Sequence, residues 1–320
     1  MTDIMGKSEQ KRLKELAGEY ISFSEPMSRH TTFRTGGKAA VFARPGSIAE
    51  LEALLDWAAE KKIACEVIGG GSNLLVKDGG FAGILINLSR CAASVFRTEY
   101  EQEDAVGLRV SAGSGLRAFC GFAVRNRLEG TEGLLGIPGS VGGGIRMNAG
   151  TALGCISDIL ESVRIMLPGG QIREMKRSEM NFSYRSLCWN ADGIAPEGRE
   201  PLILEAVFRL QKSRESVGEC KARARQMMEK RKKNQPWQFP SAGCFFKNPP
   251  GLSAGKLIDS LGLKGRRVGG AEVSCKHANF IINRHRASAS DILALADLLQ
   301  KRVRKKFGIR LEREVKIIGQ

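Results

Sequence analysis

Two glycine-dense segments have the residue types and the spacing to bind a phosphate group. The longer segment, 133–150, reads GLLGIPGSVGGGIRMNAG, and Arg146 is its single charged residue. The shorter segment, 69–73, reads GGGSN and follows the apolar residues Val67 and Ile68. Glycine lets the backbone approach a ligand and lets its N–H groups turn toward an anion. Two such loops predict a dinucleotide site, although an isolated glycine pair more often marks a packing turn.

Neither segment has a standard nucleotide-binding pattern. The Rossmann pattern places its glycines between a strand and a helix, whereas a strand-like run, Leu74–Val76, and a turn at Lys77–Gly80 follow GGGSN. No Gly-Lys-Ser/Thr follows at the spacing of a phosphate-binding P-loop. The sequence therefore predicts a dinucleotide held by a different fold.

Composition limits the class of protein. The 320 residues, 42% of them hydrophobic, suit two or three domains with their own cores. The chain has no apolar run long enough for a membrane span and no signal-peptide core, so we expect a cytoplasmic protein without a membrane partner. The net charge of +16 favours anionic partners. Its basic residues are densest at 221–233 and 301–310, where a solvated helix face is the simpler interpretation, and sparse aromatics disfavour nucleic acid.

The eight cysteines and three histidines have no metal-ligand spacing. We therefore predict reduced thiols and no metal site. Most of the cysteines are expected to be small core residues, with Cys244 set apart.

The elements that position the first loop form a small βα unit. A polar N-terminal helix precedes a turn and strand at 29–45, and Ser47 with Glu50 predicts a capping box for an amphipathic helix. A strand at 64–68 then leads into the first loop. From about Ser94 a second unit is expected, with a hairpin-like stretch, a strand at 108–112 and a helix after Gly113-Ser114-Gly115 that leads to the second glycine segment.

Further strands are predicted at 162–167, 171–175 and 202–210, and a charged helix at about 213–233. Pro236 and Pro240 then mark the start of a final segment. This segment is expected to contain a helix at 254–261, a strand at 279–283 and a helix capped by Ser290 that ends near Gly308. Alternation over 309–317 predicts a terminal strand with Glu314 on its polar face.

The motifs, taken in order from Thr31 to Gly319, resemble those of the UDP-N-acetylenolpyruvoylglucosamine reductases. They are TTFRTGG, IGGGSNLLV, GIPGSVGGGIRMNAG, SYRS, SAGCFFKNP, the pair AGKLID and GLKG, and LEREVKIIG. The short interval between Arg185 and Ser241 resembles the subgroup that lacks an extra substrate-covering insertion.

The resemblance implies an α+β fold. Its FAD-binding body is of the p-cresol methylhydroxylase/vanillyl-alcohol oxidase type, with two α/β subdomains, and a separate C-terminal α/β domain binds substrate. The implied boundaries are an N-terminal helical extension at 1–24, the FAD-binding domain at 25–212 with subdomains at about 25–92 and 93–212, and the C-terminal domain at 213–320.

The resemblance also implies an activity in the synthesis of bacterial peptidoglycan precursors. NADPH reduces FAD, and flavin N5 passes hydride to the vinyl methylene carbon of UDP-N-acetylglucosamine enolpyruvate, which becomes UDP-N-acetylmuramate. NADPH and the UDP-sugar are implied to use one pocket in alternation. We expect no nucleic acid and no obligate protein partner.

Three catalytic positions follow from the resemblance. Arg185 matches the arginine that holds the substrate carboxylate, which suits its planar fork. Glu314 matches a glutamate that, if burial keeps it protonated, donates a hydrogen bond to the developing carboxylate dianion. Cys244 stands where the family usually has the serine that donates the proton. A neutral thiol can still do so, and its ordinary pKa of about 8.5 predicts loss of activity on the alkaline side and exposure to oxidation.

The remaining implied positions bind cofactor or substrate. Those for substrate are Tyr184, Asn248 and Lys264, while Asn234 stands where the family often has a lysine. Those for flavin are Gly69, Gly70, Gly71, Ser72, Asn73, Gly136, Ser140, Gly142 and Gly143.

Other interpretations stay open on the sequence alone. Taken singly, Arg185 could be a surface ion pair, Glu314 a solvated strand residue and Cys244 a small core residue. The whole chain could be a flavin oxidase or dehydrogenase with another substrate, a non-catalytic binder of anions or nucleic acid, or a flavin-binding homologue disabled by the cysteine.

Overall fold

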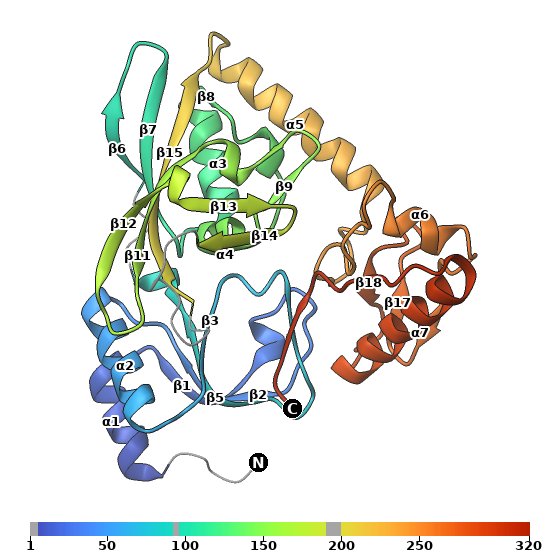
Figure 1. The fold of residues 1–320 in the computed structure, drawn as a ribbon, viewed down its shortest axis with the longest axis horizontal. Coiled ribbons are helices and arrows are strands. Elements are labelled where there is room, and N and C mark those ends of the chain that lie inside the picture. Colours follow the sequence, from blue (N-terminus) through green and yellow to red (C-terminus); the bar gives the residue numbers. More distant parts are fainter. Residues whose placement is uncertain (1–5, 92–95, 190–199) are drawn as a thin grey trace.

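The computed structural model describes residues 6–91, 96–189 and 200–320. Two sheet-based parts lie on one side of the molecule, and a C-terminal lobe lies on the other (Figure 1). The predicted start of the second unit near Ser94 falls outside the described residues, as do the first five residues of the N-terminal extension.

The first sheet has the strand order β1-β2-β5-β3, and only β1 is antiparallel to its neighbour. Two helices, α1 and α2, bury their apolar residues against it in a shared core. The elements are α1 (Lys7–Ala17), β1 (Ile21–Pro26), β2 (Lys38–Ala43), α2 (Ile48–Glu60), β3 (Cys65–Ile68) and β5 (Phe81–Asn87). The positions of α1, β2, α2 and β3 are close to those predicted, whereas β1 and β5 were not predicted.

The predicted capping box of α2 forms in part. Ser47 Oγ accepts from Glu50 N at 3.1 Å, as the pattern predicts. The Glu50 carboxylate instead accepts from Gly46 N at 2.8 Å, one residue before the expected donor.

The chain returns to the first part at its C-terminus. After the first glycine loop, β4 (Leu74–Val76) pairs in parallel with β19 (Lys316–Ile318). The terminal strand is therefore shorter than the 309–317 predicted, and Arg313 forms only an isolated bridge with Phe246. This return fixes the residues just before β19 beside the glycine loop.

The second sheet is antiparallel, with the order β12-β11-β15-β7-β6 and β8 paired to β15. Helices α3 and α4 share its buried core, in which Phe119 and Phe208 have ring centroids 4.7 Å apart. The elements are β6 (Phe96–Glu101), β7 (Ala105–Ser111), α3 (Leu116–Arg125), β8 (Leu128–Glu129), α4 (Val141–Arg146), β11 (Leu160–Met166), β12 (Ile172–Lys176) and β15 (Leu202–Lys212).

Two hairpins and a helical turn complete this part. They are η3 (Glu132–Leu134), β9 (Gly150–Thr151) with β10 (Gly154–Cys155), and β13 (Met180–Ser183) with β14 (Ser186–Trp189). The second glycine segment is thus not a continuous loop, because it contains α4, which Ser140 caps through Gly143 N at 3.3 Å.

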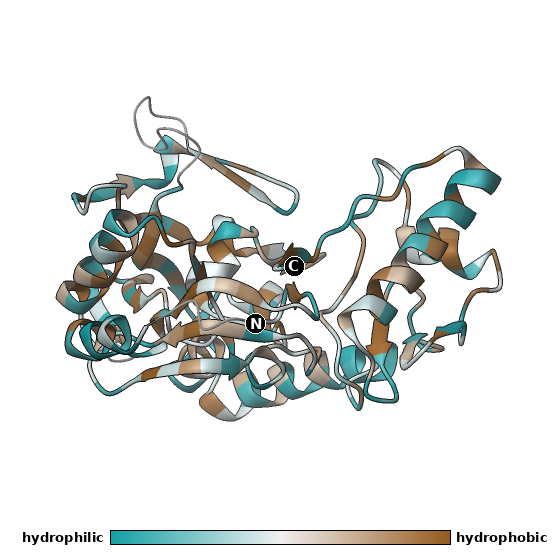
Figure 2. Cartoon of the chain, turned by 90° about the horizontal axis from the view of Figure 1, so that it is seen from below, coloured by the Kyte–Doolittle hydropathy of each residue, from teal (hydrophilic) through white to brown (hydrophobic). Residues whose placement is uncertain are grey.

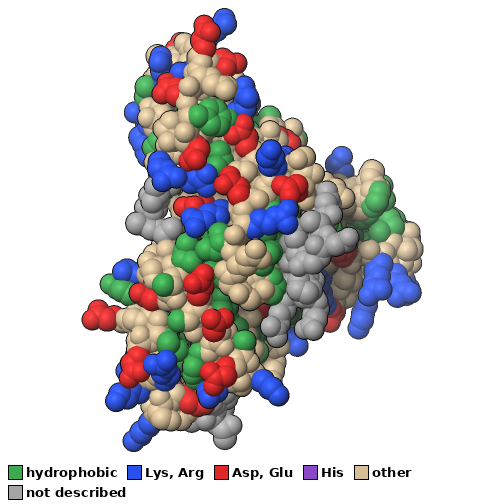
Figure 3. Space-filling model, turned by 60° about the vertical axis from the view of Figure 1, so that its left-hand side comes forward, with side chains coloured by type: hydrophobic (Ala, Val, Ile, Leu, Met, Phe, Trp, Pro, Cys, Tyr) green, Lys and Arg blue, Asp and Glu red, His purple; other side chains and the backbone are tan. Residues whose placement is uncertain are grey.

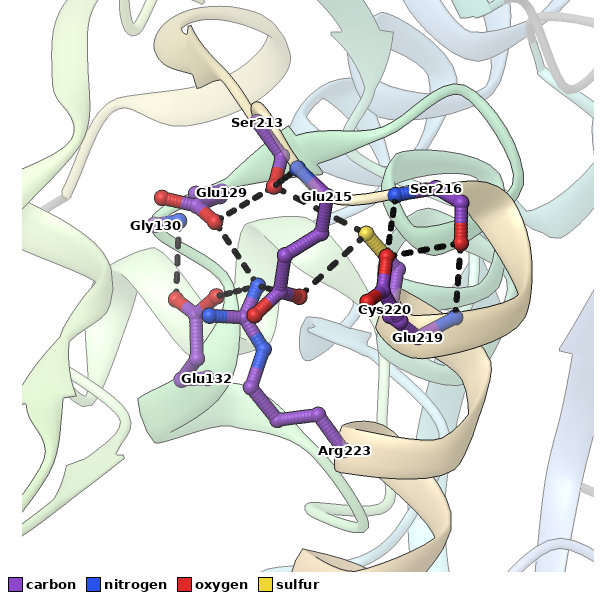
Figure 4. Close-up of polar contacts among 9 residues, drawn as sticks. All are labelled: Glu129, Gly130, Glu132, Ser213, Glu215, Ser216, Glu219, Cys220 and Arg223. Carbon is purple, nitrogen blue, oxygen red and sulfur yellow. Dashed lines mark hydrogen bonds and ion pairs between the residues drawn. The ribbon is translucent and has the colours of Figure 1, made fainter.

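A long helix, α5 (Val217–Asn234), runs from the second sheet to the C-terminal lobe (Figure 1). Its start is held by a polar network around Arg223 (Figure 4), whose guanidinium lies 2.8 Å from Glu129, 3.3 Å from Glu215 and 3.9 Å from Glu132. These contacts fix the first turns of α5 to the second part, and the last turns of the helix reach the C-terminal lobe.

The C-terminal lobe (Figure 2) has its own core, to which Phe33 and Leu75 of the first part contribute. The N-cap of α7 is Ser288, not the predicted Ser290, which instead lies in the first turn and bonds Asp78 together with Ala289 N. The elements are α6 (Ala254–Asp259), β16 (Arg267–Val268), β17 (Ala271–Val273), β18 (Ile281–Asn283) and α7 (Ala289–Phe307), which ends at Gly308 as predicted. The predicted domain boundaries stay a prediction.

Charges of both signs are interspersed on the face that Figure 3 shows. On the second sheet, for example, Arg109 Nε lies 2.8 Å from Glu99. The prediction that most cysteines are core residues is wrong, because only Cys91, Cys120 and Cys220 of the eight are buried. Within the described residues, no helix is long and apolar enough to cross a membrane, and no cluster of His, Cys, Asp and Glu could hold a metal ion.

Candidate active site

Arg185 occupies the tight turn between β13 and β14 and has a φ of 57°. Its Nη1 donates to Asn148 O at 3.3 Å and its Nη2 to Gly150 O at 3.1 Å, both at the end of the second glycine segment. Asn148 Nδ2 in turn donates to Ser183 O at 3.0 Å. Left-handed backbone is uncommon for a non-glycine residue. The two hydrogen bonds to Asn148 O and Gly150 O hold the guanidinium in one orientation.

Glu314 faces Arg185 from the C-terminal lobe. Its Oε1 lies 2.9 Å from Arg185 Nε, and its side chain is only 14% exposed, so it is not the solvated strand residue that periodicity allowed. Burial raises the pKa of Glu314, and the positive charges of Arg185 and then Lys247 oppose that shift. Burial thus favours the neutral acid, whereas the two positive charges favour the ionised form of the carboxyl group.

Cys244 is half-buried beside these two residues. Burial raises the pKa of its thiol to about 12, with a further contribution from the negative charge of Glu314, while Arg185 is the first of several groups that act against it. The predicted alkaline loss of activity and exposure to oxidation both assumed an ordinary thiol pKa. Because the thiol stays neutral far above that value, we now expect both effects only at much higher pH.

Asn279 holds the segment that carries Cys244. This asparagine is 2% exposed. Its Oδ1 accepts from Phe246 N at 3.0 Å and its Nδ2 donates to Phe246 O at 2.8 Å. Its side chain also bonds the Cys244 sulfur, which favours the thiolate and acts to lower its pKa.

Arg231, on the last turns of α5, is a site residue that the sequence analysis missed. Its guanidinium donates to Leu135 O. Its positive charge acts to lower the pKa of the Cys244 thiol, whereas burial raises that pKa. Burial lowers the pKa of Arg231 itself. Since Arg231 lies within the unbroken basic run 230–233, nothing in the spacing separates this inward-facing residue from its exposed neighbours.

The two glycine segments lie in direct contact. A Cβ on Gly69 would lie 2.3 Å from Ser140 Oγ, and one on Gly70 would lie 3.0 Å from Gly139 Cα. Ser72 Oγ donates to Pro138 O at 3.0 Å. Such approaches require glycine at these positions. The predicted partnership of the two loops is therefore present in the fold.

The first loop has the backbone donors that an anion needs. Within the described residues, the N–H groups of Gly70, Gly71 and Ser72 have no hydrogen-bond partner. In the second segment, Gly142 N donates to Ala112 O and Gly143 N to Ser140 Oγ, but the N–H groups of Gly139 and Ser140 have no partner within the described residues. Gly142 and Gly143 therefore serve the first turn of α4, and backbone donors for an anion are present in both segments.

A cleft of about 590 Å³ opens beside the first loop. Basic side chains from the turn before β2 meet the segment after α5 across it, and Gly69 and Gly70 lie on its wall. The residues that line it include Arg29, His30, Arg34, Arg44, Asn87, Trp237 and Ser241. A pyrophosphate-linked dinucleotide matches this combination of unpaired N–H groups, positive charge and space.

Gly136, also predicted to bind flavin, has a packing role in the structure. With a φ of 76°, it lies against α5, where a Cβ would be 2.8 Å from Met228 Sδ and 3.3 Å from Trp237. Gly142 is likewise packed, since a Cβ there would lie 2.8 Å from the Cβ of Ala112.

Two of the three predicted substrate residues, Asn248 and Lys264, belong to the C-terminal lobe, whereas Tyr184 lies in the β13–β14 turn of the second part. Asn248 N donates to Tyr184 Oη at 3.4 Å, and Asn248 Oδ1 accepts from Ala254 N at the start of α6. Lys264 lies toward the other end of α6, where it pairs with Asp259 at 2.7 Å. Tyr184 and Asn248 are therefore brought together with Arg185, whereas Lys264 is about one short helix away.

Together these groups can bind a carboxylate and donate a proton. A fixed guanidinium can hold a carboxylate, a carboxyl of raised pKa can donate to it, and a neutral thiol can protonate an adjacent carbanion. The positive charges of Arg185 and Arg231 act to lower the pKa of the Cys244 thiol. They therefore stabilise the thiolate that forms when the thiol has given up its proton.

Comparison with known proteins gives a consistent result. A family model described as UDP-N-acetylenolpyruvoylglucosamine reductase, C-terminal domain, matches residues 235–318, and one described as FAD binding domain matches residues 39–176. A UDP-N-acetylenolpyruvoylglucosamine reductase from Desulforamulus reducens is 39% identical over 96% of this chain and 97% of its own. One from Syntrophobacter fumaroxidans is 44% identical over 96% of this chain and 86% of its own.

A solved structure is similar over the same extent. The crystal structure of UDP-N-acetylenolpyruvylglucosamine reductase from Thermus caldophilus superimposes with a TM-score of 0.75 and 34% sequence identity, covering 93% of this chain and 98% of that chain. The predicted α+β fold, with an FAD-binding body and a separate C-terminal domain, is confirmed.

Proposed function

Because the chain belongs to the UDP-N-acetylenolpyruvoylglucosamine reductase family, we propose that it reduces the enolpyruvyl group of UDP-N-acetylglucosamine enolpyruvate with hydride from its flavin, and that Arg185, Glu314 and Cys244 bind, polarise and protonate that group. The chain is an FAD-dependent oxidoreductase, and NADPH is its reductant. The observation that carries the proposal is the 2.9 Å pair of Arg185 and Glu314 beside the Cys244 thiol.

The residues present suit FAD. The unpaired N–H groups of Gly70, Gly71 and Ser72 would hold its pyrophosphate at the wall of the 590 Å³ cleft. When bound, FAD supplies the chemistry of hydride transfer, accepting hydride from NADPH and delivering it to the vinyl methylene carbon. The chain must then manage the negative charge left on the adjacent carbon and its carboxylate.

Arg185 holds the substrate carboxylate. Of its five N–H groups, one goes to Asn148 O, one goes to Gly150 O and Nε faces Glu314, which leaves one on each terminal nitrogen. These two can donate to a carboxylate in a bidentate fashion. The left-handed turn aims them before the substrate arrives.

Glu314 becomes the neutral acid when the substrate binds. A second carboxylate at Arg185 competes for the positive charge that favours the ionised form of Glu314, and it repels that form directly. Both effects raise a pKa that burial has already raised. Protonated Glu314 can then donate a hydrogen bond to the carboxylate as hydride transfer increases its negative charge.

Cys244 donates the proton. As hydride reaches the methylene carbon, the electrons of the C=C bond move to the adjacent carbon, which takes the proton from the Cys244 sulfur. The thiolate is stabilised by Arg185, Arg231 and the hydrogen bond from Asn279 until water returns a proton. Tyr184, Asn248 and Lys264 would bind the UDP-sugar, and the hydrogen bond of Asn248 N to Tyr184 Oη beside Arg185 supports this for the first two.

The experiment is an anaerobic stopped-flow measurement. NADPH should bleach the flavin absorbance, and UDP-N-acetylglucosamine enolpyruvate added afterwards should restore it with one UDP-N-acetylmuramate formed per flavin. Bleaching without recovery on this substrate would favour a flavin enzyme with a different substrate. A colourless protein that takes up no FAD would contradict the proposal altogether.

A further inference from the structure

Asn73 ties the first glycine loop to the segment that carries Glu314. It ends the loop, and β4 begins at the next residue. Its side-chain Nδ2 donates to the carbonyl oxygen of Glu314 at 3.0 Å. Its own carbonyl oxygen accepts from Lys316 N at 3.0 Å, just before the parallel pairing of Leu74 with Lys316. One residue of the loop thus contacts the main chain on both sides of residue 315.

Glu314 has few other backbone restraints. It precedes β19, so the strand ladder does not include it, and its N–H donates to Phe245 O at 2.9 Å. The only bond to its carbonyl oxygen within the described residues is the one from Asn73. The position of its carboxyl relative to Arg185 therefore depends on Phe245 on one side and on Asn73 on the other.

We propose that Asn73 is a positioning residue that aligns Glu314 with Arg185 and links this alignment to occupancy of the glycine loop. The inference rests on the proposed role of Glu314 as the neutral acid. In this proposal the side-chain amide of Asn73 donates to Glu314, whereas the resemblance had implied that Asn73 contacts flavin. The loop residues before it, Gly70 to Ser72, keep their N–H groups for the anion.

The charged and titratable groups around Glu314 determine how its pKa would change if the residue were displaced. Arg185 faces it from the β13–β14 turn, and Lys247 and Cys244 face it from the segment before α6. Loss of the Asn73 bond should let the 314 segment move outward and admit water. Burial would then raise the pKa of Glu314 less, and the acid form would be lost at lower pH.

The test compares Asn73→Ala with Gln300→Ala. Gln300 is a matched control, because its Nε2 donates to Leu311 O at 2.7 Å in the same C-terminal segment but it has no bond to Glu314. Asn73→Asp keeps the size of the side chain and removes the donor. The measurements are flavin content, flavin reduction by NADPH, reoxidation by the enolpyruvyl substrate as a function of pH, and amide hydrogen exchange over residues 312–318 with and without FAD.

We expect both Asn73 variants to reduce their flavin at close to the wild-type rate and to reoxidise it at least about tenfold more slowly, which is about 1.4 kcal/mol of barrier. The pH at which reoxidation falls should move downward in Asn73→Ala and stay in place in Gln300→Ala. Added FAD should slow exchange over 312–318 in wild type and Gln300→Ala but not in Asn73→Ala.

Two results would overturn the inference. One is a wild-type pH profile and wild-type FAD-dependent protection in Asn73→Ala. The other is an equal loss in Asn73→Ala and Gln300→Ala, which would indicate general loosening of the C-terminal segment. Glu314→Gln in the same assay separates this inference from the proposed function. If that variant reoxidises normally, the role of Glu314 fails, whereas if it is slow while Asn73→Ala is normal, only the role of Asn73 fails.

Discussion

Arg185 Nε lies 2.9 Å from Glu314 Oε1, although the two residues are 129 positions apart and belong to different parts of the fold. The arginine comes from a hairpin turn beside the second sheet, and the glutamate comes from the return of the C-terminal lobe to the first part. The predictions for Glu314, Cys244 and Arg231 depend on this convergence and on the thiol next to it.

Glu314→Gln should slow flavin reoxidation by the enolpyruvyl substrate by roughly 10²–10³-fold, because an amide cannot match a neutral acid in stabilising the developing charge. Reduction by NADPH should change little. In the wild type, reoxidation should fall as pH rises through the raised pKa of Glu314, since the protonated form is the donor. The residual rate of the variant should lack this fall, and a fall that persists unchanged would assign it to another group.

The Cys244 thiol should not limit activity at moderately alkaline pH. Its function requires the proton, and burial raises its pKa to about 12, so the contribution of the thiol is lost only as pH rises toward that value. Wild type and Cys244→Ser should therefore have the same alkaline profile up to about pH 10. A decline near pH 8.5 in wild type that is missing in Cys244→Ser would show an ordinary thiol pKa.

Arg231→Met should slow reoxidation by roughly 10- to 100-fold, because the thiolate left after proton donation loses a positive charge inside a buried site. Lys233→Met, on the exposed side of the same helix, is the matched control and should behave as wild type. Single-turnover reoxidation with both variants checks this. Equal rates in Arg231→Met and wild type would remove Arg231 from the site.

Gly71→Ala should abolish flavin retention. Gly71 has a φ of 63°, and a Cβ there would lie 1.9 Å from His30 O, so both the backbone and the neighbouring turn resist the change. Gly218→Ala, in α5, meets only Ser216 Oγ at 3.7 Å and serves as the control. The ratio of flavin to protein absorbance after desalting measures the effect, and a yellow Gly71→Ala protein would contradict it.

The order of the elements could be predicted from the sequence because hydrophobic periodicity and turn residues are local signals. Helix α4 was missed because its residues, VGGGIR, have the composition of a loop. Ser290 was taken as the cap although the sequence also has a local signal for Ser288, because Asp291, three residues later, completes a capping box with Ser288, whereas Ser290 has Leu293 at that distance.

The site was predictable only where a motif carried it. Arg185, Glu314 and Cys244 were identified through resemblance, and periodicity by itself placed Glu314 on a solvated face. Arg231 and the role of Asn73 could not be predicted, because each depends on contacts between segments far apart in the chain. The raised pKa of Cys244 likewise follows from its surroundings rather than from its type.

Single-turnover reoxidation of the reduced enzyme by UDP-N-acetylglucosamine enolpyruvate, measured for wild type, Cys244→Ser and Cys244→Ala, tests the role of Cys244 most directly. Cys244→Ser should retain activity because a hydroxyl can donate from the same position. Cys244→Ala should be slower by roughly 10²–10⁴-fold while its reduction by NADPH is unchanged. A Cys244→Ala enzyme that reoxidises at the wild-type rate would contradict the assignment of Cys244 as the proton donor.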